Sequence, residues 1–201
     1  MEMSRDEDAR QATAPIRGRG AASRVAGRFE RRELRGEDDG WGSVYADLEG
    51  VPKPATTVAE ERARSIISRN RSPDIAFSQS VNPYRGCEHG CVYCFARPSH
   101  AYLGLSPGLD FETRLFAKTN AAERLRAEFS RKGYRGAPIA VGINTDAYQP
   151  MERRYRITRA LIEVMAECRH PFSLITKNAL VVRDLDLLAP LAARRLVSVY
   201  F

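Results

Sequence analysis

The feature that most constrains the fold of this chain is the alternation of short apolar segments with amphipathic ones from residue 75 onward. Four apolar segments are typical of buried strands: 75–81, 138–143, 172–176 and 196–200. Three segments between them have the apolar spacing of helices: 120–132, 158–168 and 184–194. Asn120 and Glu123 form a typical N-cap pairing, and Gly133 is expected to end that helix. Strands joined by helices predict an α/β fold with a parallel sheet and right-handed connections.

Polar and sulfur-bearing groups follow three of the predicted strands at their carboxyl ends. The run Cys87–Cys94 follows the first strand, Asn144-Thr145-Asp146 follow the second, and Lys177 follows the third. In parallel sheets, functional groups gather at this edge. We therefore expect the three segments to converge on one site.

Three of the four cysteines lie within eight residues, in the run Cys87-Glu-His-Gly-Cys91-Val-Tyr-Cys94. Three thiolates on one loop can bind three irons of a cubic 4Fe–4S cluster, whereas an ordinary electron-transfer cluster takes a fourth cysteine. An iron without a protein ligand indicates that a substrate or cofactor binds there, as an open position does in catalytic metal sites. The spacing thus predicts Cys87, Cys91 and Cys94 as cluster ligands.

A zinc site is the alternative interpretation of the same cysteines. Tetrahedral Zn²⁺ accepts cysteines at this spacing with a nearby histidine, and His89 or His100 could be the fourth ligand. Zinc ribbons and fingers usually present two ligand pairs separated by a longer stretch, and no second pair follows here. We therefore favour the iron–sulfur cluster and keep a zinc-binding interaction module as the alternative.

Composition indicates an ordinary soluble protein with one core domain. The 201 residues are 43% hydrophobic and 28% charged, which suffices for a core with appendages. No apolar run is long enough to span a bilayer, and residues 1–10 are too charged for a signal peptide. Four cysteines, three of them clustered, do not form a disulfide framework. Because free thiolates need a reducing compartment, we expect a cytoplasmic protein with no membrane partner.

Charge and composition divide the chain near residue 55. Residues 1–50 contain nine Lys and Arg against eleven Asp and Glu, which leaves 23 against 14, or +9, in residues 51–201. The first part is rich in Arg, Gly and acidic residues without apolar periodicity, which predicts a disordered arm and linker (1–55) before a core domain (56–201). A basic core is compatible with an anionic partner such as nucleic acid. Many Arg-rich proteins have no such partner, so charge alone does not assign one.

The cysteine run closely resembles the loop of the radical S-adenosylmethionine superfamily, with aromatic Tyr93 directly before the last cysteine. In that family the open iron chelates the amino and carboxylate groups of S-adenosylmethionine. Reductive cleavage of the cofactor then gives methionine and a 5′-deoxyadenosyl radical that abstracts hydrogen from a substrate. The resemblance implies an enzyme with a 4Fe–4S cluster, S-adenosylmethionine, and an electron donor of the flavodoxin or ferredoxin type.

Residues 72–201 resemble more narrowly the spore photoproduct lyase-like branch, which is often described as DNA-repair photolyase-like. The matching pieces are Asn82–Cys87, Gly142–Asp146, Thr176-Lys177 and Val197–Val199. The resemblance implies that Tyr93, Thr145, Lys177 and Ser198 bind S-adenosylmethionine. A lysine ammonium suits the methionyl carboxylate, and hydroxyls suit ribose or carboxylate oxygens. Without the resemblance, Lys177 would be expected to be solvated and Ser198 to fill a small core position.

One position departs from the lyase. The lyase has a cysteine that returns hydrogen to a product radical, and the matching position here is Ile143, which cannot do so readily. We therefore expect radical chemistry on a different substrate, with nucleic acid as one candidate.

The resemblance also implies a partial (β/α)6 barrel, of which this chain is predicted to contain the N-terminal part. The superfamily core has six strands, whereas four are predicted here and Phe201 ends the fourth. An open parallel strand exposes unpaired backbone and an apolar face. We therefore expect a truncated core that is poorly soluble in isolation, and an inactive cluster-binding remnant is a third hypothesis.

Other polar residues carry weaker expectations. Cys168 lies late in a predicted helix and is expected to be a small core residue. His89 and His100 flank the cysteine run and are expected to be solvated. Asp146 and Tyr148 lie at the edge where a substrate would bind. The sequence leaves the substrate and the oligomeric state open.

Overall fold

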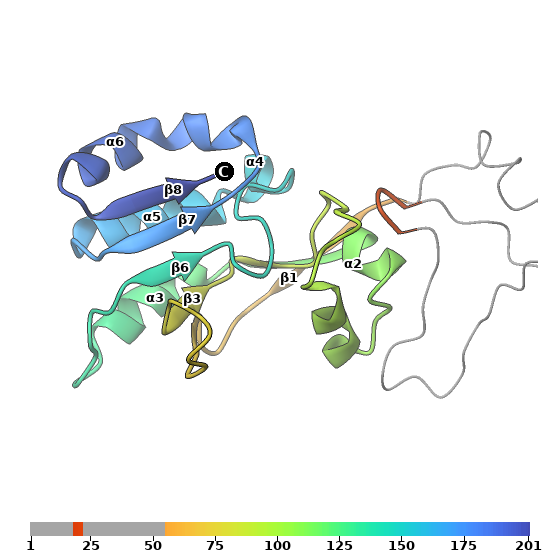
Figure 1. The fold of residues 1–201 in the computed structure, drawn as a ribbon, viewed down its shortest axis with the longest axis horizontal. Helices are drawn as coiled ribbons and strands as arrows, with labels where there is room; N and C mark the ends of the chain where they lie inside the picture. Colours follow the sequence, from red (N-terminus) through yellow and green to blue (C-terminus); the bar gives the residue numbers. More distant parts are fainter. Residues whose placement is uncertain (1–17, 22–54) are drawn as a thin grey trace, which may run out of the picture.

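The computed structural model describes residues 18–21 and 55–201, which form a mixed α/β structure with two sheets (Figure 1). The predicted disordered arm, residues 1–55, lies outside the described residues except for 18–21 and 55. Within the described ranges, none of the helices has the length and apolar character that a bilayer span requires.

The larger sheet contains the four predicted strands. Its five strands have the order β2-β3-β6-β7-β8. Their bounds are Ile67–Arg69 (β2), Gln79–Val81 (β3), Ile139–Val141 (β6), Phe172–Ile175 (β7) and Val197–Tyr200 (β8). β3, β6, β7 and β8 pair in parallel, as predicted, whereas β2 is antiparallel to β3 at one edge. The carboxyl ends of the parallel strands therefore share one edge of the sheet.

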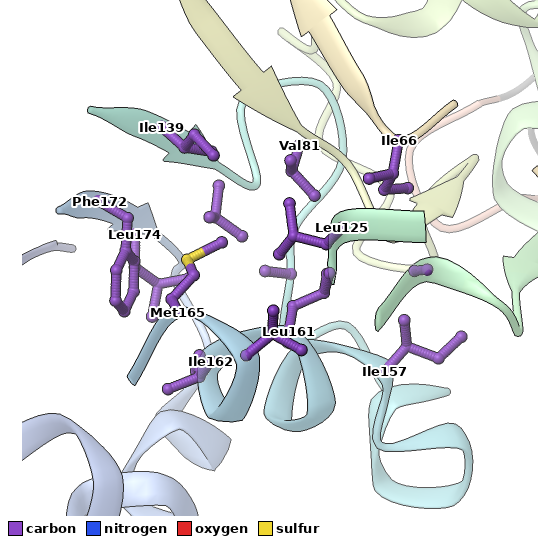
Figure 2. Packing of buried hydrophobic residues seen from close by; sticks show 14 of the residues in the cluster. Ile66, Val81, Leu125, Ile139, Ile157, Leu161, Ile162, Met165, Phe172 and Leu174 are labelled. Carbon is purple, nitrogen blue, oxygen red and sulfur yellow. The ribbon is translucent and has the colours of Figure 1, made fainter. Parts of the chain in front are cut away.

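Three helices supply the apolar faces that cover this sheet. Their bounds are Ala121–Phe129 (α3), Ile157–Glu167 (α5) and Leu185–Ala193 (α6). Leu161 and Met165 recur one turn apart on α5 and are fully buried. Figure 2 shows them with Leu125 of α3 beside Val81 and Ile139 of the strands, in one continuous core. A short helix α4 (Glu152–Tyr155) precedes α5, and a 3₁₀ helix η2 (Ala179–Asp184) precedes α6.

A smaller sheet, which the sequence did not predict, carries the cysteine run. Its strands are β1 (Thr57–Glu61), β5 (Arg114–Lys118) and β4 (Tyr84–Arg85), in the order β1-β5-β4. β1 is parallel to β5, and β4 is antiparallel to it. The 3₁₀ helix η1 (Arg97–Leu103) and helix α2 (Leu109–Thr113) follow the cysteines and lead into β5.

Several predicted element ends are wrong. The first predicted strand, 75–81, forms only at Gln79–Val81. The first predicted helix, 120–132, ends at Phe129 rather than at Gly133. Asn120 makes no side-chain cap bond, because its amide exchanges two hydrogen bonds with the backbone of Ala63, at 2.8 and 3.0 Å. Asn120 therefore joins α3 to the β1–β2 connection instead of capping the helix.

The described residues do not form a closed barrel. β8 ends the sheet order, and no further strand pairs with it within these residues. The four parallel strands with helical connections are compatible with the beginning of a (β/α)6 barrel, and the partial barrel stays a prediction.

Candidate functional site

The cysteine run begins directly after β4 and is fastened at its first residues. Gly86 has a φ of +72°, and a Cβ there would lie 2.5 Å from Leu115 Cδ2 and 2.8 Å from the Phe111 carbonyl. Only glycine fits such a left-handed, crowded position. Cys87 N then donates to that Phe111 carbonyl at 2.8 Å. Gln149, fully buried, donates to the Gly86 carbonyl at 3.0 Å and accepts from Glu88 N at 3.1 Å.

The three thiols have different surroundings. Cys87 is buried against Ala96 and Phe111, with Cys94 packed beside them. Burial raises the pKa of the Cys87 thiol to about 11. Cys91 is partly exposed, and its Sγ accepts a hydrogen bond from Lys177 Nζ at 2.8 Å. The loop therefore places the Cys91 thiol against the ammonium of Lys177, which follows β7, and holds the Cys87 thiol in apolar surroundings.

The three thiols are suitable ligands for an iron–sulfur cluster, but their side chains are not arranged around a common centre. Three free thiols lie on one loop, which is the ligand set that three irons need. Within the described residues, however, no group of three His, Cys, Asp or Glu side chains is placed to hold a metal ion. Metal binding therefore requires the three thiols to turn toward one another and to lose their protons.

Asp146 connects the cysteine loop to the ends of β6 and β7. Its carboxylate accepts hydrogen bonds from Thr176 Oγ1 at 2.7 Å, Lys177 N at 2.9 Å and Tyr148 N at 2.8 Å. His89 Nε2 lies 3.4 Å from Asp146 Oδ2. Burial alone would raise the pKa of Asp146, but these hydrogen bonds outweigh it and lower the pKa. Asp146 thus holds three segments together as an ionised carboxylate, whereas the sequence had placed it only at the substrate edge.

Among the predicted cofactor residues outside the cysteine run, Lys177 contacts a cysteine through its side chain. Its hydrogen bond to Cys91 raises the pKa of the ammonium, and the nearby Tyr93 and Cys87 act in the same direction. Tyr93 itself is 82% exposed. Segments 86 residues apart in the sequence therefore meet here, as the strand-end argument predicted.

The two predicted hydroxyl residues lie differently. Thr145 is buried, and its Oγ1 donates to the Tyr84 carbonyl at 3.1 Å, so it joins the end of β6 to β4. Ser198 lies within β8, opposite Ser173, rather than at the carboxyl end of the strand. It is exposed, contrary to the core position expected from the sequence alone.

Four of the weaker expectations are wrong. Cys168 is exposed at the end of α5, because it lies past the last buried turn. His100 is fully buried, and its Nε2 lies 2.8 Å from the Arg114 carbonyl. His89 is also largely covered, since its ring faces Asp146. Tyr148 is fully buried and donates to Asp184 at 2.9 Å, so it does not line a substrate edge.

The sequence missed a contact between residues 18–21 and the cysteine loop. Glu112, which is fully buried, accepts hydrogen bonds from Arg19 N at 2.6 Å, Gly20 N at 3.0 Å and Arg97 at 2.5 Å. This segment lies against the cysteine loop (Figure 1), so close that a Cβ on Gly20 would be 1.8 Å from the Gly90 carbonyl. The only sequence signal is the pair of Arg-Gly dipeptides at residues 17–20, and it does not identify Glu112 as the partner.

The fold and site define a mixed α/β protein with a three-cysteine loop near the carboxyl edge of a parallel sheet. The chain is 46% identical over 133 residues to uncharacterized proteins of Mycobacterium tuberculosis and Mycobacterium bovis. These matches cover 65% of this chain and 39% of those proteins. An uncharacterized protein of Methanocaldococcus jannaschii is 29% identical over 126 residues, or 63% of this chain and 44% of that protein. The chain therefore spans less than half the length of these curated relatives.

Two further comparisons gave no match. No protein-family profile matches the chain, and no solved structure does.

Proposed function

We propose that the chain is part of a radical S-adenosylmethionine enzyme in which Cys87, Cys91 and Cys94 hold a 4Fe–4S cluster. The observation that carries the proposal is the position of the three thiols on one fastened loop beside Lys177. When bound, the cluster would supply one-electron reductive cleavage of S-adenosylmethionine. The three cysteines leave one iron without a protein ligand, which is the open position that such a cofactor needs.

Lys177 has the clearest role for a side chain in this proposal. Its ammonium reaches Cys91 and is held ionised there, so it can offset thiolate charge or bind the carboxylate of an amino-acid group. Asp146 accepts from Lys177 N and fixes where that side chain begins. Exposed Tyr93 can cover a ligand above the loop, whereas Thr145 and Ser198 would contact the cofactor only if it extends along the strand ends.

The zinc alternative has less support among the described residues. His100 is buried and uses Nε2 on the Arg114 carbonyl, and the His89 ring faces Asp146. Neither histidine forms a group with the cysteines that could hold a metal. A zinc site would therefore need the same convergence of thiols and, in addition, release of a histidine from its partner.

Partners follow from the same proposal. An electron donor of the flavodoxin or ferredoxin type could reach the loop where Val92, Tyr93 and Phe95 are each more than three-quarters exposed. Such exposed apolar clusters favour protein contacts. We place the enzyme in the cytoplasm, where thiols stay reduced. Nucleic acid is a candidate substrate because of the resemblance and the basic core.

Release of 5′-deoxyadenosine tests the proposed activity. The anaerobically reconstituted chain, given S-adenosylmethionine and dithionite, is expected to release 5′-deoxyadenosine and methionine in equal amounts. Cys91→Ser should abolish the release, whereas Cys168→Ser, an exposed cysteine outside the loop, should leave it unchanged. A loaded chain that releases no 5′-deoxyadenosine would be the inactive remnant instead of an enzyme.

A further inference from the structure

A cavity of about 520 Å³ lies where the two sheets meet. Its wall includes the β1–β2 connection, the end of β5, the segment between β3 and β4, and part of η1. Asn82 and Asn144 contribute from the carboxyl ends of β3 and β6. The volume lies in the range of sites for small molecules.

The charge of this wall is strongly positive. Four basic residues line the cavity, namely Arg62, Arg64, Arg85 and Lys118, against a single carboxylate, Glu61. Arg85 already engages Glu61 through two hydrogen bonds, at 2.7 and 2.9 Å. Arg62 faces Glu123 across 3.5 Å at the surface. Within the described residues, Lys118 and Arg64 are left without an ion-pair partner.

Among these four basic residues, Lys118 gives the strongest indication of an anion site. The only hydrogen bond that its side chain makes to a described residue is donated from Nζ to the Asn82 carbonyl at 2.7 Å. Burial, followed by the nearby Arg85, lowers the pKa of Lys118 to about 8. Glu61 acts in the opposite direction but offsets the Lys118 charge only in part, because its carboxylate is paired with Arg85. A partly buried ammonium without a full counter-charge is unfavourable. A bound anion would supply that counter-charge.

A neutral amide donor completes the wall. Asn82 Oδ1 accepts from Asn144 N at 2.8 Å, which leaves Asn82 Nδ2 as a donor without a partner among the described residues. His100 also lines the cavity, but its Nε2 donates to the Arg114 carbonyl, so the Nδ1 of the neutral ring is an acceptor and offers an anion no hydrogen bond. An ammonium, a guanidinium and an amide donor together match an anion with several oxygens better than a single carboxylate.

We propose that this cavity binds a small molecule through a phosphate group, with Lys118 and Arg64 as its principal contacts. Two uncompensated cations match the charge of a phosphate monoester or diphosphate. The cavity is larger than a phosphate, which leaves room for the rest of the molecule. Tyr84 and Arg85 line the cavity and form strand β4, which directly precedes the cysteine run in the sequence. That the ligand is the substrate rests on the proposed function, whereas phosphate binding itself does not.

Calorimetric titration of the full chain with inorganic pyrophosphate, at constant low ionic strength, tests this proposal. Lys118→Gln is expected to weaken binding at least about tenfold, since a buried charge-assisted contact is lost. Arg64→Gln should weaken it about threefold or more; Arg64 is exposed, so this variant is expected to fold. Lys132→Gln removes an equal charge at an exposed site outside the cavity and should bind like the unmodified chain.

Two outcomes would overturn the proposal. Absence of pyrophosphate binding at millimolar concentration, or equal binding by all three variants, excludes a phosphate site in this cavity. A deoxyoligonucleotide without terminal phosphates provides the second arm. Binding of that oligonucleotide that depends on Lys118, without pyrophosphate binding, would replace the small molecule with a nucleic-acid backbone. Because none of these measurements uses the cluster, their failure leaves the proposed function untouched.

Discussion

At the scale of single residues, Gly90 is the point where residues 18–21 press on the cysteine loop. It has a φ of +60°, and a Cβ there would lie 2.4 Å from Arg19 Cβ. Gly133 is a matched control, since its φ is +80° but a Cβ there would meet nothing within 4 Å. Gly133→Ala should therefore cost only backbone strain, about 1 kcal/mol.

Gly90→Ala should destabilise the chain more than Gly133→Ala does, because it adds the clash with Arg19 to the same strain. Urea unfolding of the two variants gives the comparison. Equal losses would mean that residues 18–21 do not rest on the loop in solution.

His170 makes stability depend on pH. Its Nδ1 donates to the Pro171 carbonyl at 2.9 Å, its Nε2 accepts from Tyr134 at 2.8 Å, and its ring stacks on Phe129. Burial lowers the pKa of His170 below its ordinary value. The unfolded chain therefore takes up the proton first as pH falls. This contribution to stability is complete above about pH 6.5 and is lost as pH falls toward the folded-state pKa.

Thermal unfolding of the unmodified chain should thus shift to lower temperature between about pH 7.5 and 5.5. His170→Gln, which cannot titrate, should have a shallower dependence. The slope would not vanish, because burial lowers the pKa of His100 as well. If the unfolding temperatures of the unmodified chain and of His170→Gln fell equally with pH, this would contradict a neutral, hydrogen-bonded imidazole at His170.

The position of a single residue could be predicted from the sequence where the arrangement of the strands determines it. Lys177 was expected near the cysteines because both follow parallel strands, and its ammonium does contact Cys91. Tyr148 was expected at the same edge, but it is buried against Asp184, which lies 36 residues away. The direction of one side chain in a loop depends on such distant partners, and no local pattern encodes them.

At the scale of elements, Glu152 fixes the beginning of α5. Arg156 precedes the helix without a side-chain cap, and the fully buried Glu152 carboxylate accepts instead from Thr158 N at 2.9 Å. The same carboxylate accepts from Tyr84 and from Arg183, the latter at 2.7 Å. Glu152 therefore joins α5, β4 and η2 through one buried group.

Glu152→Ala should cost about 3 kcal/mol or more, because it leaves the buried Tyr84 hydroxyl and the first N–H groups of α5 unsatisfied and removes one of the two carboxylates that pair with Arg183. Glu167→Ala removes an exposed carboxylate that pairs with Arg126 and should cost much less, because solvent screens this ion pair. Chemical denaturation of both variants compares the two losses. A loss for Glu152→Ala no larger than for Glu167→Ala would show that the buried network does not hold these elements.

Elements were predictable where burial sets the pattern. All three residues of β6 are buried, and the apolar run alone identified it. β1 was missed because its sequence, Thr-Val-Ala-Glu-Glu, contains no fully buried residue and the strand is held by backbone pairing with β5. Asn120 was expected to cap α3, but its amide bonds to the backbone of Ala63 instead. Contacts over such distances cannot be derived from local spacing.

At the scale of the whole molecule, the residues of the proposed site come from both sheets. The smaller sheet carries the cysteine loop, and the larger one supplies Asp146 and Lys177 from its strand ends. The basic cavity lies where they meet. The match covers only 39% of the length of the mycobacterial relatives, so the activity of a protein of that length stays a proposal.

Metal and sulfide content shows whether Cys87, Cys91 and Cys94 hold a 4Fe–4S cluster. After anaerobic reconstitution, the chain should contain about four iron and four sulfide, following the stoichiometry of a 4Fe–4S cluster. Replacement of Cys87, Cys91 or Cys94 by serine should abolish stable loading, whereas Cys168→Ser should load fully. A chain that holds one zinc and no sulfide, or that loads equally without the three clustered cysteines, would contradict the account.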